Sequence, residues 1–139
     1  MSFKYAVLGA GRQGIAAAYD LGRFGDAEKI LLVDVNAQAS EKGAARINKL
    51  LKKRIAQPVT ADMSDTGKLA GILKGTNALI SAVPYKYNLE LTKLAIKVRA
   101  CITDLGGNTA VVRKQLSLNA KAKKAGVTIV PDCGMGPGL

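Results

Sequence analysis

The chain has 139 residues, which is enough for one domain with its own hydrophobic core. Hydrophobic residues make up 48% of it, which argues against a disordered chain. No apolar run approaches the roughly 20 residues that span a bilayer, and the first residues lack the pattern of a signal peptide. We therefore expect a cytoplasmic protein with no membrane partner.

The net charge is +11, for which a nucleic-acid-binding surface would be one explanation. Aromatic residues make up only 4% of the chain, however, so they supply no stacking platform. Basic residues in the segment 46–54 alternate with Ile47, Leu50 and Leu51 as on an amphipathic helix. We interpret the charge as solvated helix faces and expect no nucleic-acid partner. With no histidine and two cysteines, neither a metal site nor a disulfide framework is expected.

Six short and nearly continuous apolar runs follow one another along the chain. Such runs are typical of parallel strands that are buried on both faces, because helices cover both sides of the sheet. The segment 57–62 has the weakest pattern of the six. The predicted strands are residues 4–10, 29–35, 57–62, 77–83, 100–105 and 126–131.

Amphipathic helices are predicted between these strands. Residues 12–22 form an alanine-rich helix directly after the first strand, and residues 64–75 form a short helix interrupted by glycines. The spacing of apolar residues predicts two more helices, one around 44–51 and one around 91–98. Asn88 is the expected N-cap of the latter, with Glu90 in its first turn.

The alternation of strand and helix predicts one domain with a doubly wound parallel α/β sheet, helices on both faces and right-handed crossovers. If the fold is of the dinucleotide-binding Rossmann type, the strand order is 3-2-1-4-5-6. Cys101 would then begin the fifth strand and Cys133 would follow the sixth. Because this places them at opposite ends of the sheet, both cysteines are expected to be free.

The first predicted strand runs into Gly9, Gly11 and Gly14, which have the spacing G-x-G-x-x-G. Gly9 permits a tight turn, Gly11 lets the backbone approach a pyrophosphate, and Gly14 lets the helix pack on the strand. The N-terminus of that helix offers free N–H groups to the phosphates. Asp34 ends the second strand, where its carboxylate can accept hydrogen bonds from the adenosine ribose. This context favours a dinucleotide site over a merely structural glycine turn.

The residues beside this motif bear on which dinucleotide binds. A 2′-phosphate next to Asp34 would meet like-charge repulsion, and no arginine directly follows Asp34 to offset it. NAD is therefore favoured over NADP. Arg12 either covers the pyrophosphate or faces solvent, and Gln13 is a candidate contact in the same turn.

Ligands of open α/β sheets collect at the carboxyl ends of the strands. Asp62 follows the third strand, near the expected adenine. Pro84 ends the fourth strand and, with Ser81 and Val83, turns the chain over the cofactor. The last two strands lead into Asp104, Gly106, Gly107, Asn108 and Asp132.

Three kinds of role are expected in this last group. The adjacent glycines allow close approach of the backbone to a ligand, and Asn108 is expected to cap the next helix. Asp104 and Asp132 are candidates for an acid or base by position alone. The catalytic residues therefore stay unassigned.

Four stretches together resemble the saccharopine dehydrogenase family, and more closely its lysine 6-dehydrogenase branch. The resemblance covers the whole chain, and its last three stretches are fairly specific. They are GAGRQG, SAVPYKYNLELTKLAI, DLGGNTAVVRKQ and AGVTIVPDCGMGPG.

This resemblance implies an NAD(P)-dependent oxidoreductase acting on the C–N bond of lysine or a lysine-derived amino acid, which would be the small-molecule partner. It also implies that the glycines of the first motif hold the pyrophosphate and that Asp34 holds the ribose. Residues 81–84 would border the nicotinamide, and residues 104–108 and 132–138 would face the cleft between cofactor and substrate. Family members continue into a substrate domain. We expect that domain to be absent from this chain, and the chain to bind NAD but to be inactive or nearly so alone.

Three alternatives stay open at this stage. A stand-alone NAD-sensing regulatory Rossmann module would need no substrate domain, although it would also not need the three specific stretches after the fourth, fifth and sixth strands. A methyltransferase suits the glycine spacing and Asp34 less well, and a nucleic-acid binder accounts only for the charge. An exposed docking face would favour a homo-oligomer.

Overall fold

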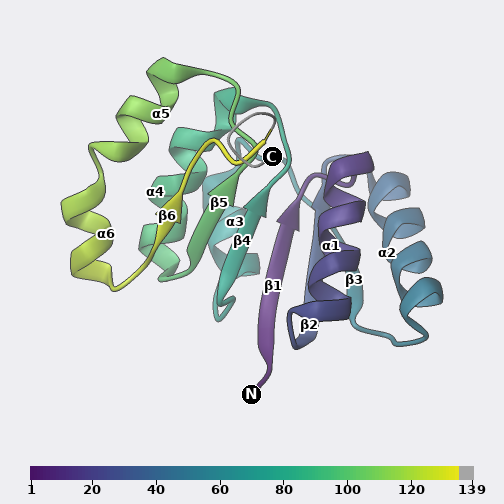
Figure 1. The fold of residues 1–139 in the computed structure, drawn as a ribbon. Coiled ribbons are helices and arrows are strands. Elements are labelled where there is room, and N and C mark those ends of the chain that lie inside the picture. The colour runs from purple at the N-terminus through teal and green to yellow at the C-terminus, as the bar shows by residue number, and fades with distance from the viewer. Residues whose placement is uncertain (135–139) are drawn as a thin grey trace.

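The structure is a computed structural model and describes residues 1–134. Its centre is a six-stranded, all-parallel sheet in the order β3-β2-β1-β4-β5-β6 (Figure 1), which confirms the predicted fold and strand order. The carboxyl ends of all six strands therefore lie at the same edge of the sheet. The strands are β1 (Phe3–Leu8), β2 (Ala27–Asp34), β3 (Ala56–Thr60), β4 (Ala78–Ser81), β5 (Cys101–Asp104) and β6 (Ile129–Val130).

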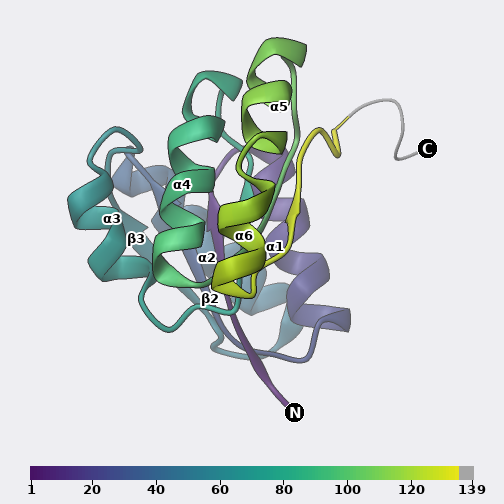
Figure 2. The same cartoon turned by 90° about the vertical axis from the view of Figure 1, so that its left-hand side faces the viewer.

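Helices connect the strands and cover both faces of the sheet (Figures 1 and 2). None of the helices among residues 1–134 is long and apolar enough to cross a membrane. A short 3₁₀ helix, η1 (Tyr85–Tyr87), precedes the fourth α-helix. The α-helices are α1 (Arg12–Phe24), α2 (Ala37–Leu51), α3 (Thr66–Leu73), α4 (Asn88–Val98), α5 (Thr109–Leu116) and α6 (Asn119–Ala125).

Two hydrophobic cores lie on opposite faces of the sheet. On one face α1 and α2 pack against β1, β2 and β3 through residues such as Ala18 and Ile47. On the other face α3 and α4 contribute Leu69 and Leu91 to the core. Leu50, which was expected in the apolar stripe of α2, is instead 56% exposed.

The prediction that every strand is buried on both faces is wrong for the edge strands β3 and β6, most of whose residues are exposed or only partly buried, and also for β4 and β5. Leu79 and Ile102 are buried, whereas their neighbours Ile80 and Thr103 are only partly so. The physical reason is that α1 and α2 cover the half of the sheet formed by β1, β2 and β3 (Figure 1). Side chains of β4 and β5 on that face therefore lack the full helical cover that the opposite face has.

Two local predictions are also wrong. The segment 126–131 is a strand only at Ile129–Val130, because Gly126 adopts φ 72° and ends α6 in the left-handed conformation. Asn88 is the first residue of α4 rather than its N-cap, and its buried side chain accepts a hydrogen bond from Ser81 Oγ at 2.8 Å. Glu90 lies in the first turn as predicted.

Other local predictions are confirmed. Asn108 caps α5, since its side chain accepts a hydrogen bond from the N–H of Val111 at 3.1 Å. Cys101 and Cys133 are both free. Residues 136 and 138, the last two glycines of the loop expected at the cofactor–substrate cleft, lie outside the described residues.

Candidate cofactor-binding site

The loops that follow β1, β2, β3 and β4 surround a cavity of about 440 Å³. It lies at the carboxyl edge of the sheet, between β1 and β4, where the strand order reverses. Doubly wound sheets bind their ligands at this point. The cavity is lined by Gly9, Gly11, Asp34, Val35, Asp62, Met63, Ala82, Val83, Pro84, Lys86 and Tyr87.

Two glycines of the G-x-G-x-x-G motif are required by the packing of the chain itself. Gly9 has φ +105°, and a Cβ there would lie 2.6 Å from the carbonyl oxygen of Ala82. A Cβ on Gly14 would overlap the carbonyl oxygen of Gly9, so Gly14 lets α1 approach the turn after β1. These contacts explain both glycines without a ligand.

Gly11 is different, because nothing in the described chain requires a glycine there. Its φ of −76° is open to any residue, and apart from its two neighbours in the chain no described residue has an atom within 4 Å of an added Cβ. Gly11 is the N-cap of α1, whose first turn contains no acidic residue and is capped by no side chain. The free N–H groups and the missing Cβ together leave a place for an anion against the backbone.

Asp34 has a structural role that the sequence analysis missed. Its Oδ2 accepts a hydrogen bond from the N–H of Ala10 at 2.7 Å, and its Oδ1 accepts one from the N–H of Asn36 at 2.8 Å. The carboxylate thus ties the glycine-rich turn to the end of β2. Because a carboxylate has about four acceptor positions, Asp34 can still accept hydrogen bonds from ribose hydroxyls.

Asp62 and Lys86 lie on the wall that the loops after β3 and β4 form. Asp62 Oδ1 accepts hydrogen bonds from Ser64 Oγ at 2.6 Å and from Ser64 N–H at 2.8 Å. The bond from the Ser64 hydroxyl, followed by the bond from its backbone and by the charge of Lys86, lowers the pKa of Asp62 below its usual value. Lys86 Nζ lies 5.0 Å from the centre of the Tyr87 ring, a cation–π contact.

The sequence did not single out Lys86 and Tyr87, nor Val35 and Met63, whereas Ala82 lies in the predicted stretch 81–84. The signal for the first two was available, since they follow Pro84 in the turn expected to cross the cofactor. Arg12 and Gln13 lie exposed in the first turn of α1. Arg12 lines a neighbouring groove between α1 and α2.

Besides Arg12, Gln13 and Gly14, three more candidate residues lie outside the cavity wall. Ser81 and Asp104 have exposed fractions of 0% and 1%, and both side chains are used in internal hydrogen bonds. Gly106 lies against Asp132, since a Cβ on it would be 2.8 Å from Asp132 Cα. Val83 and Pro84 do line the cavity. The side chains of Ser81 and Asp104 are thus not available to a ligand in the cavity.

Comparisons with known proteins agree with this geometry. Residues 5–130 match the family model described as saccharopine dehydrogenase NADP binding domain. A curated relative, the saccharopine dehydrogenase [NADP(+), L-glutamate-forming] of Saccharomyces cerevisiae, is 24% identical over 106 residues, which are 76% of this chain and 23% of the relative.

Solved structures show the same fold. Apo saccharopine dehydrogenase (L-Glu forming) from Saccharomyces cerevisiae superposes with a TM-score of 0.76 at 20% identity, over 99% of this chain and 28% of that one. Quinate dehydrogenase from Corynebacterium glutamicum in complex with NAD gives a TM-score of 0.65 at 16% identity, over 97% of this chain and 46% of that one. The chain thus spans about a quarter of the length of the saccharopine dehydrogenases it matches.

Proposed function

Since this chain belongs to the family of saccharopine dehydrogenase NADP-binding domains, we propose that it is the NAD-binding part of an oxidoreductase acting on the C–N bond of lysine or a lysine-derived amino acid. The stretches SAVPYKYNLELTKLAI and DLGGNTAVVRKQ, which resemble the lysine 6-dehydrogenase branch, support the substrate class. The name of the curated relative also supports it, because saccharopine is a lysine derivative.

The proposal that a dinucleotide binds in the cavity depends mainly on Gly11. A glycine that no contact within the described chain requires, at the uncapped start of α1, fits the pyrophosphate of a dinucleotide. Asp34, at the end of the neighbouring strand β2, fits the adenosine ribose. When bound there, the nicotinamide ring supplies hydride transfer, and the residues described here bind and orient it.

The charges in the cavity favour NAD over NADP, although the family model is named for NADP. Asp34 and Asp62 are acidic, and Lys86 is the single basic residue that residues 1–134 contribute to the wall. The 2′-phosphate of NADP would have to lie beside Asp34, where like charges repel. We therefore propose NAD as the preferred cofactor.

We also propose that residues 1–139 alone are inactive or nearly so. Hydride transfer needs the substrate carbon held close to the nicotinamide in aligned geometry. In the saccharopine dehydrogenases that match this chain, about three-quarters of the polypeptide lies outside the matched region. A substrate domain of that kind would supply the second wall of the cleft.

Isothermal titration calorimetry of the purified chain with NAD, NADP and ADP tests the proposal. We expect NAD to bind more tightly than NADP, and no reduction of NAD when lysine is added. A chain that binds none of the three nucleotides would contradict the cofactor proposal. Lysine-dependent formation of NADH by the chain alone would contradict the proposed inactivity.

A further inference from the structure

The loops that follow β5 and β6 are joined through one buried carboxylate. Asp104 Oδ1 accepts hydrogen bonds from the N–H groups of Gly106 at 2.8 Å and Asp132 at 3.0 Å. Its backbone carbonyl accepts the N–H of Cys133 at 2.8 Å. Its Oδ2 accepts a hydrogen bond from Gln115 Nε2 at 2.7 Å. Asp104 therefore holds both loops and anchors them to α5.

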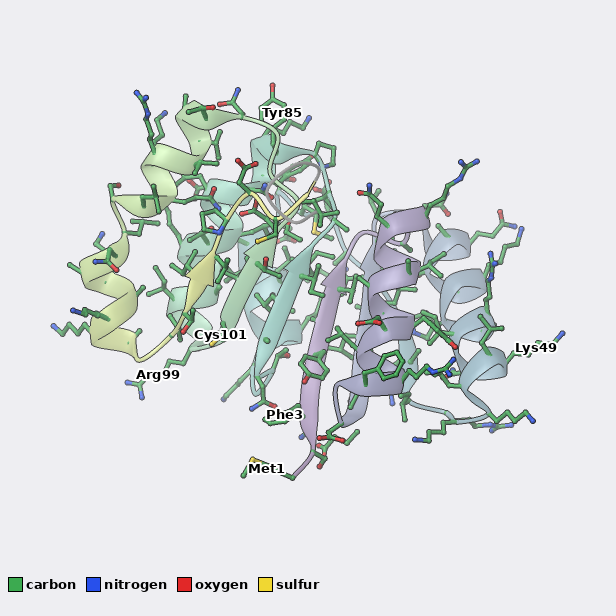
Figure 3. The ribbon with its side chains drawn as sticks, viewed as in Figure 1. Met1, Phe3, Lys49, Tyr85, Arg99 and Cys101 are labelled. Carbon is green, nitrogen blue, oxygen red and sulfur yellow. The ribbon has the colours of Figure 1, made fainter. Side chains whose placement is uncertain are left out.

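Close backbone packing adds to these hydrogen bonds. A Cβ on Gly106 would overlap the Asp132 side chain, and a Cβ on Gly134 would overlap the carbonyl oxygen of Leu105. A Cβ on Gly107 would lie 3.3 Å from the ring of Tyr85, which belongs to the loop after β4. The loops after β4, β5 and β6 thus touch one another, and Figure 3 shows Tyr85 at this end of the molecule.

A chain of buried hydrogen bonds continues from Asp104 to β4. Gln115 Nε2 also donates to Thr92 Oγ1 at 2.8 Å, and Thr92 Oγ1 donates to the carbonyl of Asn88 at 2.7 Å. Ser81 Oγ closes the chain by donating to Asn88 Oδ1 at 2.8 Å. Ser81 lies just before the cavity-lining residues of the β4 loop, so Asp104 is linked to the cavity wall through α4 and α5.

The orientation of the Gln115 amide depends on Asp104. Among the described residues nothing donates a hydrogen bond to Gln115 Oε1, which is buried. A rotated amide would place that oxygen against the Asp104 carboxylate, where two acceptors face each other. The Oδ2 acceptor of Asp104 therefore fixes the orientation of the Gln115 amide, whose Nε2 also donates to Thr92.

We propose that Asp104 is a positioning residue, which holds the loops after β4, β5 and β6 in the arrangement that receives the nicotinamide half of the cofactor. The proposal rests on the proposed function, because the adenosine half binds at Asp34 and the other half then extends towards these loops. Asp104 is 1% exposed and does not itself touch the cofactor. This positioning role takes the place of the two roles that the sequence suggested for Asp104, which were direct contact with the cofactor and acid–base catalysis.

The variant Asp104→Asn tests this role by comparing two ligands. Asparagine keeps the shape but turns one acceptor into a donor, which would face the Nε2 donor of Gln115. We expect the Kd for NAD to rise about tenfold, because that factor corresponds to the free energy of about one hydrogen bond to a charged group. The Kd for ADP, which lacks the nicotinamide half, should change less than about twofold. A purely structural role would instead lower the melting temperature and leave the ratio of the two Kd values unchanged.

A second variant and a control complete the test. Gly106→Ala separates the loops by steric overlap without changing the hydrogen-bonding groups, and it should raise the NAD-to-ADP ratio of Kd values in the same direction. It decides the question if Asp104→Asn does not fold. Asp65→Asn makes the same chemical change at the exposed N-cap of α3 and should leave both Kd values unchanged. An unchanged ratio in the loop variants refutes the positioning role, whereas a wild-type chain that binds neither ligand refutes the proposed function itself.

Discussion

Replacing Gly11 by alanine should separate binding from folding. Apart from its two neighbours in the chain, no described residue has an atom within 4 Å of an added Cβ, and the backbone φ of −76° is accessible to alanine. The same Cβ projects from the cavity wall at the N-cap of α1, where we place the pyrophosphate. We therefore expect the variant Gly11→Ala to fold as the wild type does and to bind NAD poorly.

Both magnitudes follow from the local geometry. Alanine is a worse N-cap than glycine, which lowers the free energy of unfolding by up to about 1 kcal/mol. Alanine also makes the unfolded chain less flexible, which raises the free energy of unfolding by about 0.4–1 kcal/mol. The net change in the free energy of unfolding should thus stay within about 0.5 kcal/mol. Forcing a methyl group into a close contact costs about 1–3 kcal/mol, which corresponds to a roughly 5- to 150-fold higher Kd for NAD.

Urea unfolding and calorimetric titration with NAD measure the two quantities on the same samples. Gly14→Ala is the first control variant, in which the same substitution disturbs packing within the chain. Its Cβ would overlap the carbonyl oxygen of Gly9, so it should lower the free energy of unfolding by at least about 1–3 kcal/mol. Gly71→Ala is the second, because Gly71 lies inside α3 with nothing within 4 Å of a Cβ. It should gain about 0.5–1 kcal/mol and leave NAD binding unchanged.

One pattern of results would refute the reasoning. If Gly11→Ala bound NAD as tightly as the wild type, no ligand would occupy the space in front of Gly11, and the observation that carries the proposed function would lose its meaning. A large loss of stability in the same variant would show that Gly11 has a packing role within the chain.

Two further predictions concern the acidic residues of the cavity. The variant Asp34→Asn removes the negative charge but keeps an oxygen that can accept the N–H of Ala10. In calorimetric titrations the affinity for NADP should rise about tenfold relative to the affinity for NAD. An unchanged ratio of the two affinities would show that Asp34 does not select the cofactor. Ser64→Ala removes the hydroxyl that contributes most to the low pKa of Asp62, so NMR titration of the carboxyl should show a higher pKa. The stability contributed by ionised Asp62 is complete above the usual pKa of the group and is lost as the pH falls through the lowered value. In the variant this contribution should be smaller, and its loss should be complete at a higher pH. A pKa of Asp62 that is the same in both proteins would contradict this assignment of its cause.

The sequence was sufficient to predict the sheet, because its six strands are short apolar runs separated by helical segments. The places where the prediction failed depend on tertiary structure. Gly126 could belong to a strand or end a helix, and the preceding helix decided the outcome. Asn88 has the chemistry of an N-cap, but Ser81 offers it a buried hydrogen bond that only the folded chain brings near.

Some polar residues at the strand ends are buried under helices and others line the cavity, and the sequence does not distinguish the two groups. Ser81 and Asp104 are paired in register, and both point to the face covered by α4 and α5. Neither β4 (Ala-Leu-Ile-Ser) nor β5 (Cys-Ile-Thr-Asp) alternates regularly between apolar and polar residues, so the sequence does not show which residues face which helices. Asp104 was therefore correctly placed at the carboxyl edge of the sheet, but its side chain lies in the interior.

The glycines at the carboxyl edge of the sheet are needed for two different reasons, which their spacing in the sequence does not distinguish. Gly106 and Gly134 allow two loops to pack against each other, as Gly9 and Gly14 allow the first turn to pack against its neighbours. Gly11 alone among these five has no contact that forbids a side chain. For a glycine in the wall of the cavity, the absence of an internal packing reason favours close approach of a ligand, whereas Gly71, which also lacks such a contact, lies in α3 away from the cavity. Under the proposed function, the pyrophosphate would therefore lie against Gly11, while Gly106 and Gly134 let the loops after β5 and β6 pack against each other.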